Sequence, residues 1–117
     1  MKNFKGQGRD MSVTVTDPPT PAAGDPVLWG EVPGVAVTDE REDGKTTVRF
    51  YGVYELSVQA VDTAGASDVN DADKIYYTAG ETPPLSKKDT GVFFGQAYDG
   101  TITGGATSVV QVRLGRV

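Results

Sequence analysis

The stretch KTTVRFYGVYELSVQA, Lys45–Ala60, decides how this 117-residue chain folds. Its even-numbered residues from Val48 onward are mostly apolar, and its odd-numbered residues are mostly polar. This alternation has the two-residue period of a half-buried β-strand. At about 3.3 Å per residue the stretch would extend about 50 Å, which is too long for one straight strand in a small domain. We therefore expect a bend near Gly52, where no side chain restricts the backbone.

Shorter segments on both sides of this stretch show the same alternation and predict further strands. They are Ser12–Thr16, Pro26–Gly30, Gly34–Asp39, Lys74–Ala79, Val92–Asp99 and Ser108–Leu114, with a brief edge strand at Thr101–Ala106. The pair Asp43-Gly44 is a strong hairpin signal just before the central stretch. No segment has a sustained 3.6-residue period, so the sequence predicts an all-β protein.

Three further segments are expected to be loops. Asp17–Pro26 holds four of the seven prolines, which cannot donate to a strand ladder. Asp62–Asp73 is rich in small and acidic residues and could hold one helical turn, and Gly80–Gly91 is also long and polar. The predicted organisation is a small single-domain β-barrel or β-sandwich, residues 12–117, preceded by an extended N-terminal arm, residues 1–11.

A weak internal repeat bears on the architecture. The segments GDPVLWG, GVAVTD and TTVRFYGV resemble ADKIYYT, GVFFGQAYD and SVVQVRLGRV, with offsets of 48 (Asp25 to Asp73), 57 (Gly34 to Gly91) and 64 (Arg49 to Arg113). Two similar three-strand units could face each other as a barrel or a sandwich. Chance similarity between short strands explains the pattern equally well.

Charge is unevenly distributed along the chain. Eleven basic and sixteen acidic residues give a net charge of −5, so general affinity for nucleic acid is not expected. Residues 1–10 carry Lys2, Lys5 and Arg9 against Asp10, a net charge of +2, which leaves −7 on the remainder. A short basic arm on an acidic body suits docking onto another protein.

The chain contains no cysteine and no histidine. These absences exclude disulfides, a thiolate nucleophile, and the commonest general base and metal ligand. No apolar run reaches membrane-spanning length, and the N-terminal MKNFKGQG lacks the hydrophobic segment of a signal peptide. We therefore expect a protein made in the cytoplasm that has no enzymatic activity, no cofactor and no membrane partner.

One short motif partly matches a phosphate-binding loop. Gly44-Lys45-Thr46 has the last three residues of that loop, but Asp39 stands where the loop needs its first glycine. A strand rather than a helix is also predicted to follow. The hairpin is the preferred interpretation.

A second motif, Asp68–Asp73, resembles the start of a calcium loop. The helical version of this loop needs an oxygen ligand, a glycine and a glutamate at positions that are Ala72, Asp73 and Ala79 here. A solvated acidic loop is the preferred interpretation, with a non-standard calcium site as the alternative. No metal site and no catalytic constellation are predicted.

Aromatic side chains are more informative about binding. Tyr51 lies on the polar face of the central stretch, and Trp29 and Tyr76 lie in strands with bulky groups on both faces. With Tyr54 they are candidate interface residues, because aromatics on an outer face often mark an interface. Capping the ends of a barrel is an equally good explanation. Phe4 has no evident core role in the arm and is a candidate anchor in a partner's pocket.

Several short motifs occur in an order found in a known family. They are Met1-Lys2-Asn3-Phe4-Lys5, Gly24-Asp25-Pro26-Val27, Pro33-Gly34-Val35-Ala36-Val37-Thr38, Gly52-Val53-Tyr54-Glu55-Leu56, Gly91-Val92 and Val110-Gln111-Val112-Arg113-Leu114-Gly115. Together they resemble the small capsid decoration, or cement, proteins of tailed bacteriophages and prophages. The resemblance spans nearly the whole chain, although the loops at Asp17–Gly24 and Gly80–Asp89 are longer than the family pattern.

This resemblance implies a β-barrel-like, non-catalytic protein on the outer capsid surface of the virion. It would bind the expanded head, commonly as a homotrimer, and clamp neighbouring subunits of the major capsid protein. The family's N-terminal segment corresponds to the arm, which makes Lys2, Asn3, Phe4 and Lys5 candidate capsid-binding residues. The main alternative is a carbohydrate-binding β-module of a virion or surface protein that stacks sugars on Trp29 and the tyrosines.

Overall fold

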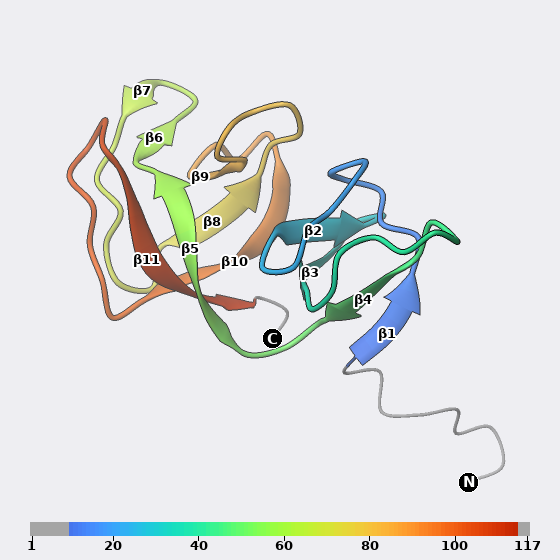
Figure 1. Ribbon diagram of the computed structural model, residues 1–117. Coiled ribbons are helices and arrows are strands. Elements are labelled where there is room, and N and C mark those ends of the chain that lie inside the picture. Colours follow the sequence, from blue (N-terminus) through green and yellow to red (C-terminus); the bar gives the residue numbers. More distant parts are fainter. Residues whose placement is uncertain (1–9, 115–117) are drawn as a thin grey trace, which may run out of the picture.

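The computed structural model describes residues 10–114 and confirms an all-β protein (Figure 1). Its strands are β1 Asp10–Val13, β2 Pro26–Trp29, β3 Val32–Ala36, β4 Thr46–Arg49, β5 Val53–Gln59, β6 Val61–Asp62, β7 Gly65–Ala66, β8 Lys74–Tyr77, β9 Leu85–Ser86, β10 Val92–Tyr98 and β11 Thr107–Leu114. They form a four-stranded sheet, a closed five-stranded barrel and a small hairpin. Within residues 10–114, no helix is long and apolar enough to cross a membrane.

The N-terminal sheet has the strand order β1-β4-β3-β2, with every neighbouring pair antiparallel. After β1 the chain crosses to the opposite edge of this sheet, where Asp17 bridges to Leu28 of β2. Segment 10–17 therefore forms one edge strand of the sheet and pairs with the strand at the other edge, so the sheet is curved and nearly closed. Val13 and Val15, which alternate along this segment, are buried inside the roll.

The barrel has the strand order β10-β11-β5-β9-β8 and closes on itself. Its longest pairing joins β5 to β11 over seven residue pairs, from Thr107 opposite Gln59 to Arg113 opposite Val53. The last gap is closed by β9, which pairs parallel to β5 through only two residues and antiparallel to β8. Closure removes the exposed sheet edges that would otherwise invite aggregation.

The expected bend in the central stretch lies at the junction of the two sheets. The stretch divides into β4, in the N-terminal sheet, and β5, in the barrel, with Gly52 between them at φ +110°. A residue with a side chain rarely adopts this backbone conformation, so glycine fits the corner. The Tyr54 ring also lies 3.3 Å from where a Cβ on Gly52 would be.

Burial follows the alternation along both halves of the central stretch. Val48, Leu56 and Val58 are 0–5 % exposed, whereas Tyr51 and Val53 are each 44 % exposed. The two halves belong to different cores. Val48 packs with Val13, Val15, Val27 and Ala36 inside the N-terminal sheet, while Leu56 and Val58 pack with Phe94, Ile75 and other residues inside the barrel.

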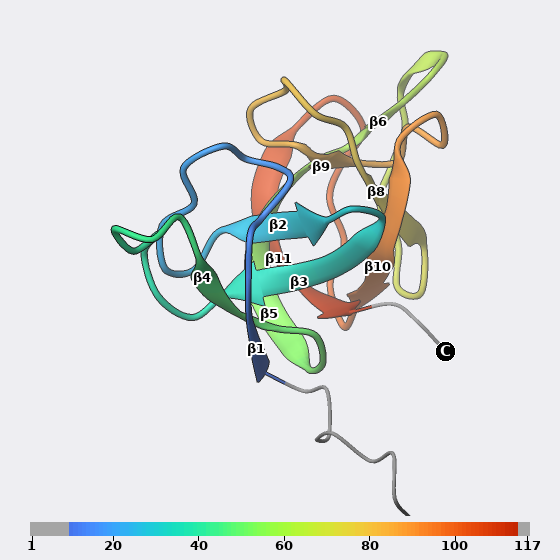
Figure 2. The ribbon, with the colours of Figure 1, turned by 90° about the vertical axis from the view of Figure 1, so that its right-hand side faces the viewer.

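The two halves of the chain repeat one topology. Across the N-terminal sheet the order is β1-β4-β3-β2, so the first strand of that half lies beside its fourth, then its third and second. The barrel repeats this order with β5, β11, β10 and β8. Each half is thus a Greek-key arrangement of four strands, with β9 inserted as a fifth strand in the second half. Figure 2 shows the N-terminal sheet with β2 and β3 crossing in front of the barrel strands β5 and β11.

The structure corrects one offset of the sequence repeat. Val27 pairs with Gly34 in the first half, and its equivalent Ile75 pairs with Gly95 in the second half. The counterpart of Gly34 is therefore Gly95, an offset of 61, and the expected match to Gly91 is wrong. A register shift between Phe93 and Gly95, together with the longer loop before β10, accounts for the displacement.

Several short strands were missing from the sequence-based expectations. The sequence predicts a loop over 62–73, but the first part of this segment contributes to the β6–β7 hairpin, and Val69 bridges to Ile102. The expected loop Gly80–Gly91 contains β9. The first strand also covers Asp10–Val13 rather than Ser12–Thr16, so it begins inside the segment predicted as an arm.

Gly34 and Gly95 predict a matched pair of destabilising substitutions. A Cβ on Gly95 would collide with the carbonyl oxygen of Arg113, and a Cβ on Gly34 would collide with Val48 and lie 3.0 Å from the Arg49 carbonyl oxygen. Gly95→Ala and Gly34→Ala should each lower the free energy of unfolding by about 2–3 kcal/mol. Urea unfolding measures this loss.

Gly100→Ala is the matched control. A Cβ at Gly100 would make ordinary contacts at 3.6 Å with Val110, so the change should stay within about 0.5 kcal/mol of the parent. If Gly95→Ala proves as stable as Gly100→Ala, the close approach of β10 and β11 at Gly95 is not as described.

Candidate interaction surface

Two exposed aromatic residues, Trp29 and Tyr51, lie at the corner between the two sheets with the half-buried Phe50 and Tyr54. Trp29 is 39 % exposed, and its ring centroid lies 5.8 Å from that of Phe50 at an interplanar angle of 45°. Tyr51 is 44 % exposed, and the guanidinium of Arg49 lies 5.7 Å from the centre of its ring. The Tyr54 hydroxyl donates a hydrogen bond of 2.7 Å to the Tyr51 carbonyl oxygen. We call Trp29, Phe50, Tyr51, Val53 and Tyr54 the aromatic corner.

The aromatic corner also lies beside the first described residue of the chain. Asp10, the first residue of β1, pairs with Arg49, the residue immediately before Phe50. On the other side, the Leu114 amide donates to the Gly52 carbonyl oxygen at 2.9 Å, so the last strand ends at the same corner. Both ends of the described chain therefore lie next to the aromatic corner.

The sequence-predicted interface residues separate into three groups. Trp29, Tyr51 and Tyr54 come together at the aromatic corner. Tyr76 lies apart on β8, half-buried, with its ring centroid 5.9 Å from that of Phe93 on the neighbouring strand. Lys2, Asn3, Phe4 and Lys5 lie outside the described residues.

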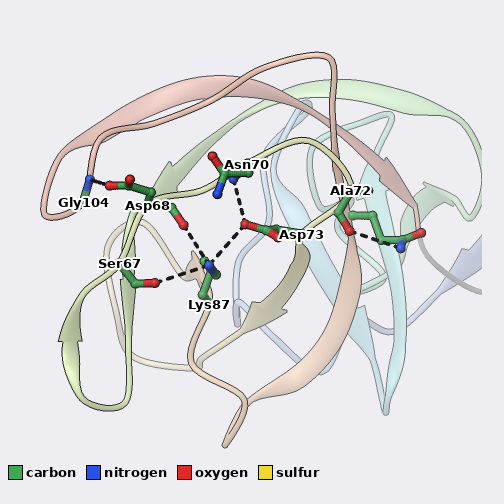
Figure 3. A network of polar contacts seen from close by, with 8 residues as sticks. Ser67, Asp68, Asn70, Ala72, Asp73, Lys87 and Gly104 are labelled. Atoms are coloured by element: carbon green, nitrogen blue, oxygen red, sulfur yellow. Dashed lines mark hydrogen bonds and ion pairs between the residues drawn. The ribbon is translucent and has the colours of Figure 1, made fainter.

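The acidic loop after β7 is organised around a lysine (Figure 3). The Lys87 ammonium lies 3.2 Å from Asp73 Oδ2 and donates to the Asp68 carbonyl oxygen at 2.7 Å and to Ser67 Oγ at 3.3 Å. Asp73 Oδ2 also accepts from the Asn70 amide at 2.7 Å. Lys87 thus brings its positive charge to the oxygens of the segment that resembles a calcium loop.

The other acids of this loop bind backbone amides from across the barrel end. Asp68 Oδ1 accepts from the Gly104 amide at 2.6 Å, and Asp71 Oδ1 accepts from the Asp99 amide at 2.6 Å. Asp68 and Asp71 are exposed, as the interpretation of a solvated acidic loop predicted, and their hydrogen bonds also tie three loops together. Within residues 10–114 no group of three or more acidic residues is arranged to hold a metal ion.

The Gly44-Lys45-Thr46 motif lies in a turn, as the hairpin interpretation predicted. Gly44 has a φ of +80°, and the Arg41 and Lys45 backbones are joined by a 2.9 Å hydrogen bond. Strand β4 follows directly at Thr46, so no helix N-terminus faces this turn. The motif therefore lacks the geometry that binds phosphate.

A buried tyrosine lies between the two halves of the molecule. Tyr77 is 4 % exposed, stacks on Phe94 and lines a hollow of about 340 Å³ that also includes Asp17 and Asp25. Burial, together with the smaller effect of the negative charges of Asp17 and Asp25, raises the pKa of the Tyr77 hydroxyl from 10.0 to about 12. The hydroxyl therefore stays protonated over the physiological range.

Comparison with known protein families identifies the chain. A family model described as phage cement protein matches residues 6–114, which include both halves and the aromatic corner. The chain belongs to the phage cement protein family. No curated protein and no solved structure matches it.

Membership in the cement protein family accounts for the kind of surface that the structure presents. Cement proteins are structural proteins that associate with the phage capsid and stabilise it. Such a role needs a binding surface rather than a reaction centre. The aromatic corner of this cement protein, next to the start of β1, is the candidate for that surface.

Sequence patterns missed two features of this cement protein. Lys87 was not singled out because its partners lie about 14 to 20 residues earlier in the chain, and no local motif links them. Tyr77 meets Asp17 and Asp25 only because the two Greek-key halves pack together. Periodicity identified Tyr77 as a strand residue but carries no information on contacts between the halves.

Lys87 of this cement protein provides a stability test. Lys87→Met should lower the free energy of unfolding by about 1–2 kcal/mol, because it leaves the Asp68 carbonyl and Asp73 without their ammonium partner. Lys74→Met, at an exposed lysine on β8, is the control and should change stability by less than about 0.5 kcal/mol. Equal effects in thermal denaturation would contradict the central role of Lys87.

Tyr77 predicts the behaviour of the protein at alkaline pH. The folded-state pKa exceeds the unfolded value of 10.0, so between about pH 10 and pH 12 the unfolded state loses a proton that the folded state keeps. Stability present below pH 10 is therefore lost as the pH rises, by about 1–2 kcal/mol after allowing for solvent in the hollow. Absorbance at 295 nm should show one of the five tyrosines titrating late. Tyr77→Phe should abolish that late step, and its persistence in the variant would assign it elsewhere.

Proposed function

We propose that this protein decorates the outer surface of the expanded phage head as a homotrimer and clamps neighbouring subunits of the major capsid protein. In this role it acts without catalysis, without cofactors, and without nucleic acid or membrane partners. The family match over residues 6–114 is the observation that carries the proposal. The protein would be made in the host cytoplasm and would function on the virion.

The arrangement of the aromatic corner supports a contact with the shell. Trp29, Tyr51 and Val53 are each 39–44 % exposed, and Asp10, which follows Lys2, Lys5 and Arg9 in the sequence, pairs with Arg49 beside them. Aromatic residues and arginine are enriched in the energetic centres of protein interfaces. We place the capsid contact on one continuous surface formed by Lys2, Asn3, Phe4 and Lys5 together with the aromatic corner.

Several copies acting together would strengthen a weak individual contact. A homotrimer presents three arms, and linked binding sites can exceed single-site affinity by a factor on the order of 10²–10⁴ when the geometry allows simultaneous contact. A modest interface on each copy is therefore sufficient for a clamp.

Co-sedimentation with undecorated, expanded heads tests the proposal. The full chain is compared with a variant that begins at Asp10, because this cut removes residues 1–9 and leaves the β1–β4 pairing intact. Saturable binding by the full chain alone supports the cement role and places the contact in the arm. Equal binding by both supports the role and places the contact on the body. Failure of both on heads that accept a native cement protein refutes the proposal.

Two substitutions in the arm test its chemistry. Phe4→Ala and Lys5→Glu should each weaken head binding at least about fivefold, because they remove an apolar anchor and reverse a basic charge at the proposed contact. The thermal unfolding of both variants is measured beside the parent and should be unchanged. Lys74→Glu, at an exposed lysine on β8, is the charge-matched control for Lys5→Glu and should bind normally. Normal binding by both arm variants would remove the arm from the contact.

The carbohydrate-binding alternative has a separate outcome. Sugar stacking needs an accessible aromatic face, which Trp29, 39 % exposed beside Phe50, would have to supply. Because the family match favours a capsid contact, a glycan array is expected to be negative. Specific binding to a glycan that disappears in Trp29→Ala, without any binding to heads, would favour the carbohydrate module.

A further inference from the structure

A continuous groove separates the N-terminal half from the barrel. It consists of two adjoining hollows of about 340 and 300 Å³, which share Asp25, Pro26 and Pro84. One wall comes from the loop before β2, and the other comes from the end of β8 and the loop before β9. A volume of this size is at the lower end of the range for binding pockets.

Carboxylates dominate the charge in the larger hollow. Asp17, Asp25 and Glu81 line it, and the residues lining it include no lysine or arginine within the described part of the chain. The negative charge of Glu81 is balanced by Lys88, whose ammonium lies 2.6 Å from Glu81 Oε2. Asp25 Oδ2 accepts one hydrogen bond, from the Ala22 amide at 2.9 Å. Two carboxylates, those of Asp17 and Asp25, are left without a cationic partner among residues 10–114.

A tyrosine hydroxyl opens onto the same hollow. The Tyr77 side chain is 4 % exposed and lines the hollow, and no hydrogen bond joins its hydroxyl to another residue of the range 10–114. The hydroxyl is not among the fully buried unpaired polar atoms of that range, so it is accessible from the hollow and can pair with a bound group or with water. As a protonated phenol, Tyr77 can accept a hydrogen bond from a cation and donate one to a carboxylate.

The backbone around the hollow disfavours anions. Pro18, Pro19, Pro26 and Pro84 make up a large part of its lining, and proline has no backbone N–H. These segments therefore offer carbonyl oxygens as acceptors and few amide donors. A ligand that supplies donors and positive charge satisfies the acceptors, the phenol and the two carboxylates together.

We propose that this groove binds the cationic side chain of a lysine or arginine from a partner polypeptide in the assembled head. The ammonium or guanidinium enters between Asp17 and Asp25, with the Tyr77 hydroxyl as a further hydrogen-bond partner. Two polypeptides can supply the side chain, namely the major capsid protein or the basic arm of a neighbouring copy, which carries Lys2, Lys5 and Arg9. The identity of these partners rests on the proposed function, whereas the cation site rests on the groove alone.

A small probe tests the cation site without any capsid. Nα-acetyl-arginine amide is titrated into the full-length protein, and backbone chemical shifts are followed by NMR. Shifts should concentrate at residues 17–26 and 77–84, with weak affinity because the site is open to solvent. The uncharged Nα-acetyl-glutamine amide should produce no comparable shifts. Shifts spread over the whole surface, or equal shifts with both probes, would overturn the proposal.

Substitutions in the groove separate a specific site from general acidity. The double variant Asp17→Asn with Asp25→Asn should weaken arginine-amide binding at least about fivefold, and asparagine at position 25 can still accept the Ala22 hydrogen bond. Glu42→Gln with Asp89→Asn removes the same charge from exposed positions that line neither hollow, so it should bind the probe normally. An equal loss of arginine-amide binding in both double variants would show that net charge alone causes the effect and would overturn the proposal.

The same variants identify the source of the side chain. If the groove takes a capsid lysine or arginine, the Asp17→Asn, Asp25→Asn variant should bind heads at least about fivefold more weakly while its self-association in sedimentation velocity is unchanged. If it takes a neighbour's arm, self-association should weaken in this variant and in the chain that begins at Asp10. Unchanged head binding and self-association would refute a role for the groove in assembly. Absence of head binding by the parent protein refutes the proposed function and leaves the probe titration as the test of the site.

Discussion

The structure depends on one backbone constraint, the left-handed conformation of Gly52. A single alternating stretch enters one sheet as β4 and leaves in another as β5, and the change of direction takes place at this residue, with a φ of +110°. The alternation continues across the corner, so the same face of the stretch supplies Val48 to one core and Leu56 to the other. Without the corner, the second half of the stretch would extend away from the barrel that it closes.

The period-two signal predicted most of the fold because it reports which side chains are buried. It located the long strands β5, β10 and β11 and the inward orientation of Val110, Val112 and Leu114. It could not locate β9, because two paired residues, Leu85 and Ser86, carry no detectable period. Closure of the barrel depends on that short strand, so the sequence left barrel and sandwich as equal alternatives.

The candidate site was predicted only in part, for a related reason. Trp29, Tyr51 and Tyr54 could be suspected one by one from their strands, but their meeting at one corner depends on the packing of the two sheets. The surroundings of Tyr77 could not be predicted from the sequence at all. Its neighbours Asp17 and Asp25 lie about 50 to 60 positions earlier, and the contact exists only because two repeated units pack against each other.

Charge is used differently in the two acidic regions of the molecule. Around Lys87 the carboxylates of Asp68, Asp71 and Asp73 are bound to an ammonium or to backbone amides, and they stabilise the end of the barrel. In the groove, Asp17 and Asp25 have no cation of their own within residues 10–114. Composition alone could not make this distinction, since both regions appear in the sequence as short acidic stretches near glycine or proline.

The attachment of segment 10–17 to both edges of its sheet has a mechanical consequence. A pull on the chain before Asp10, directed along the strand, would load the four β1–β4 residue pairs in shear, so that they resist together rather than open one after another. Any slip would then be opposed by the bridge between Asp17 and Leu28 on the far edge. Tension on the chain before Asp10 is thereby distributed across the whole N-terminal sheet, because segment 10–17 connects its two edges.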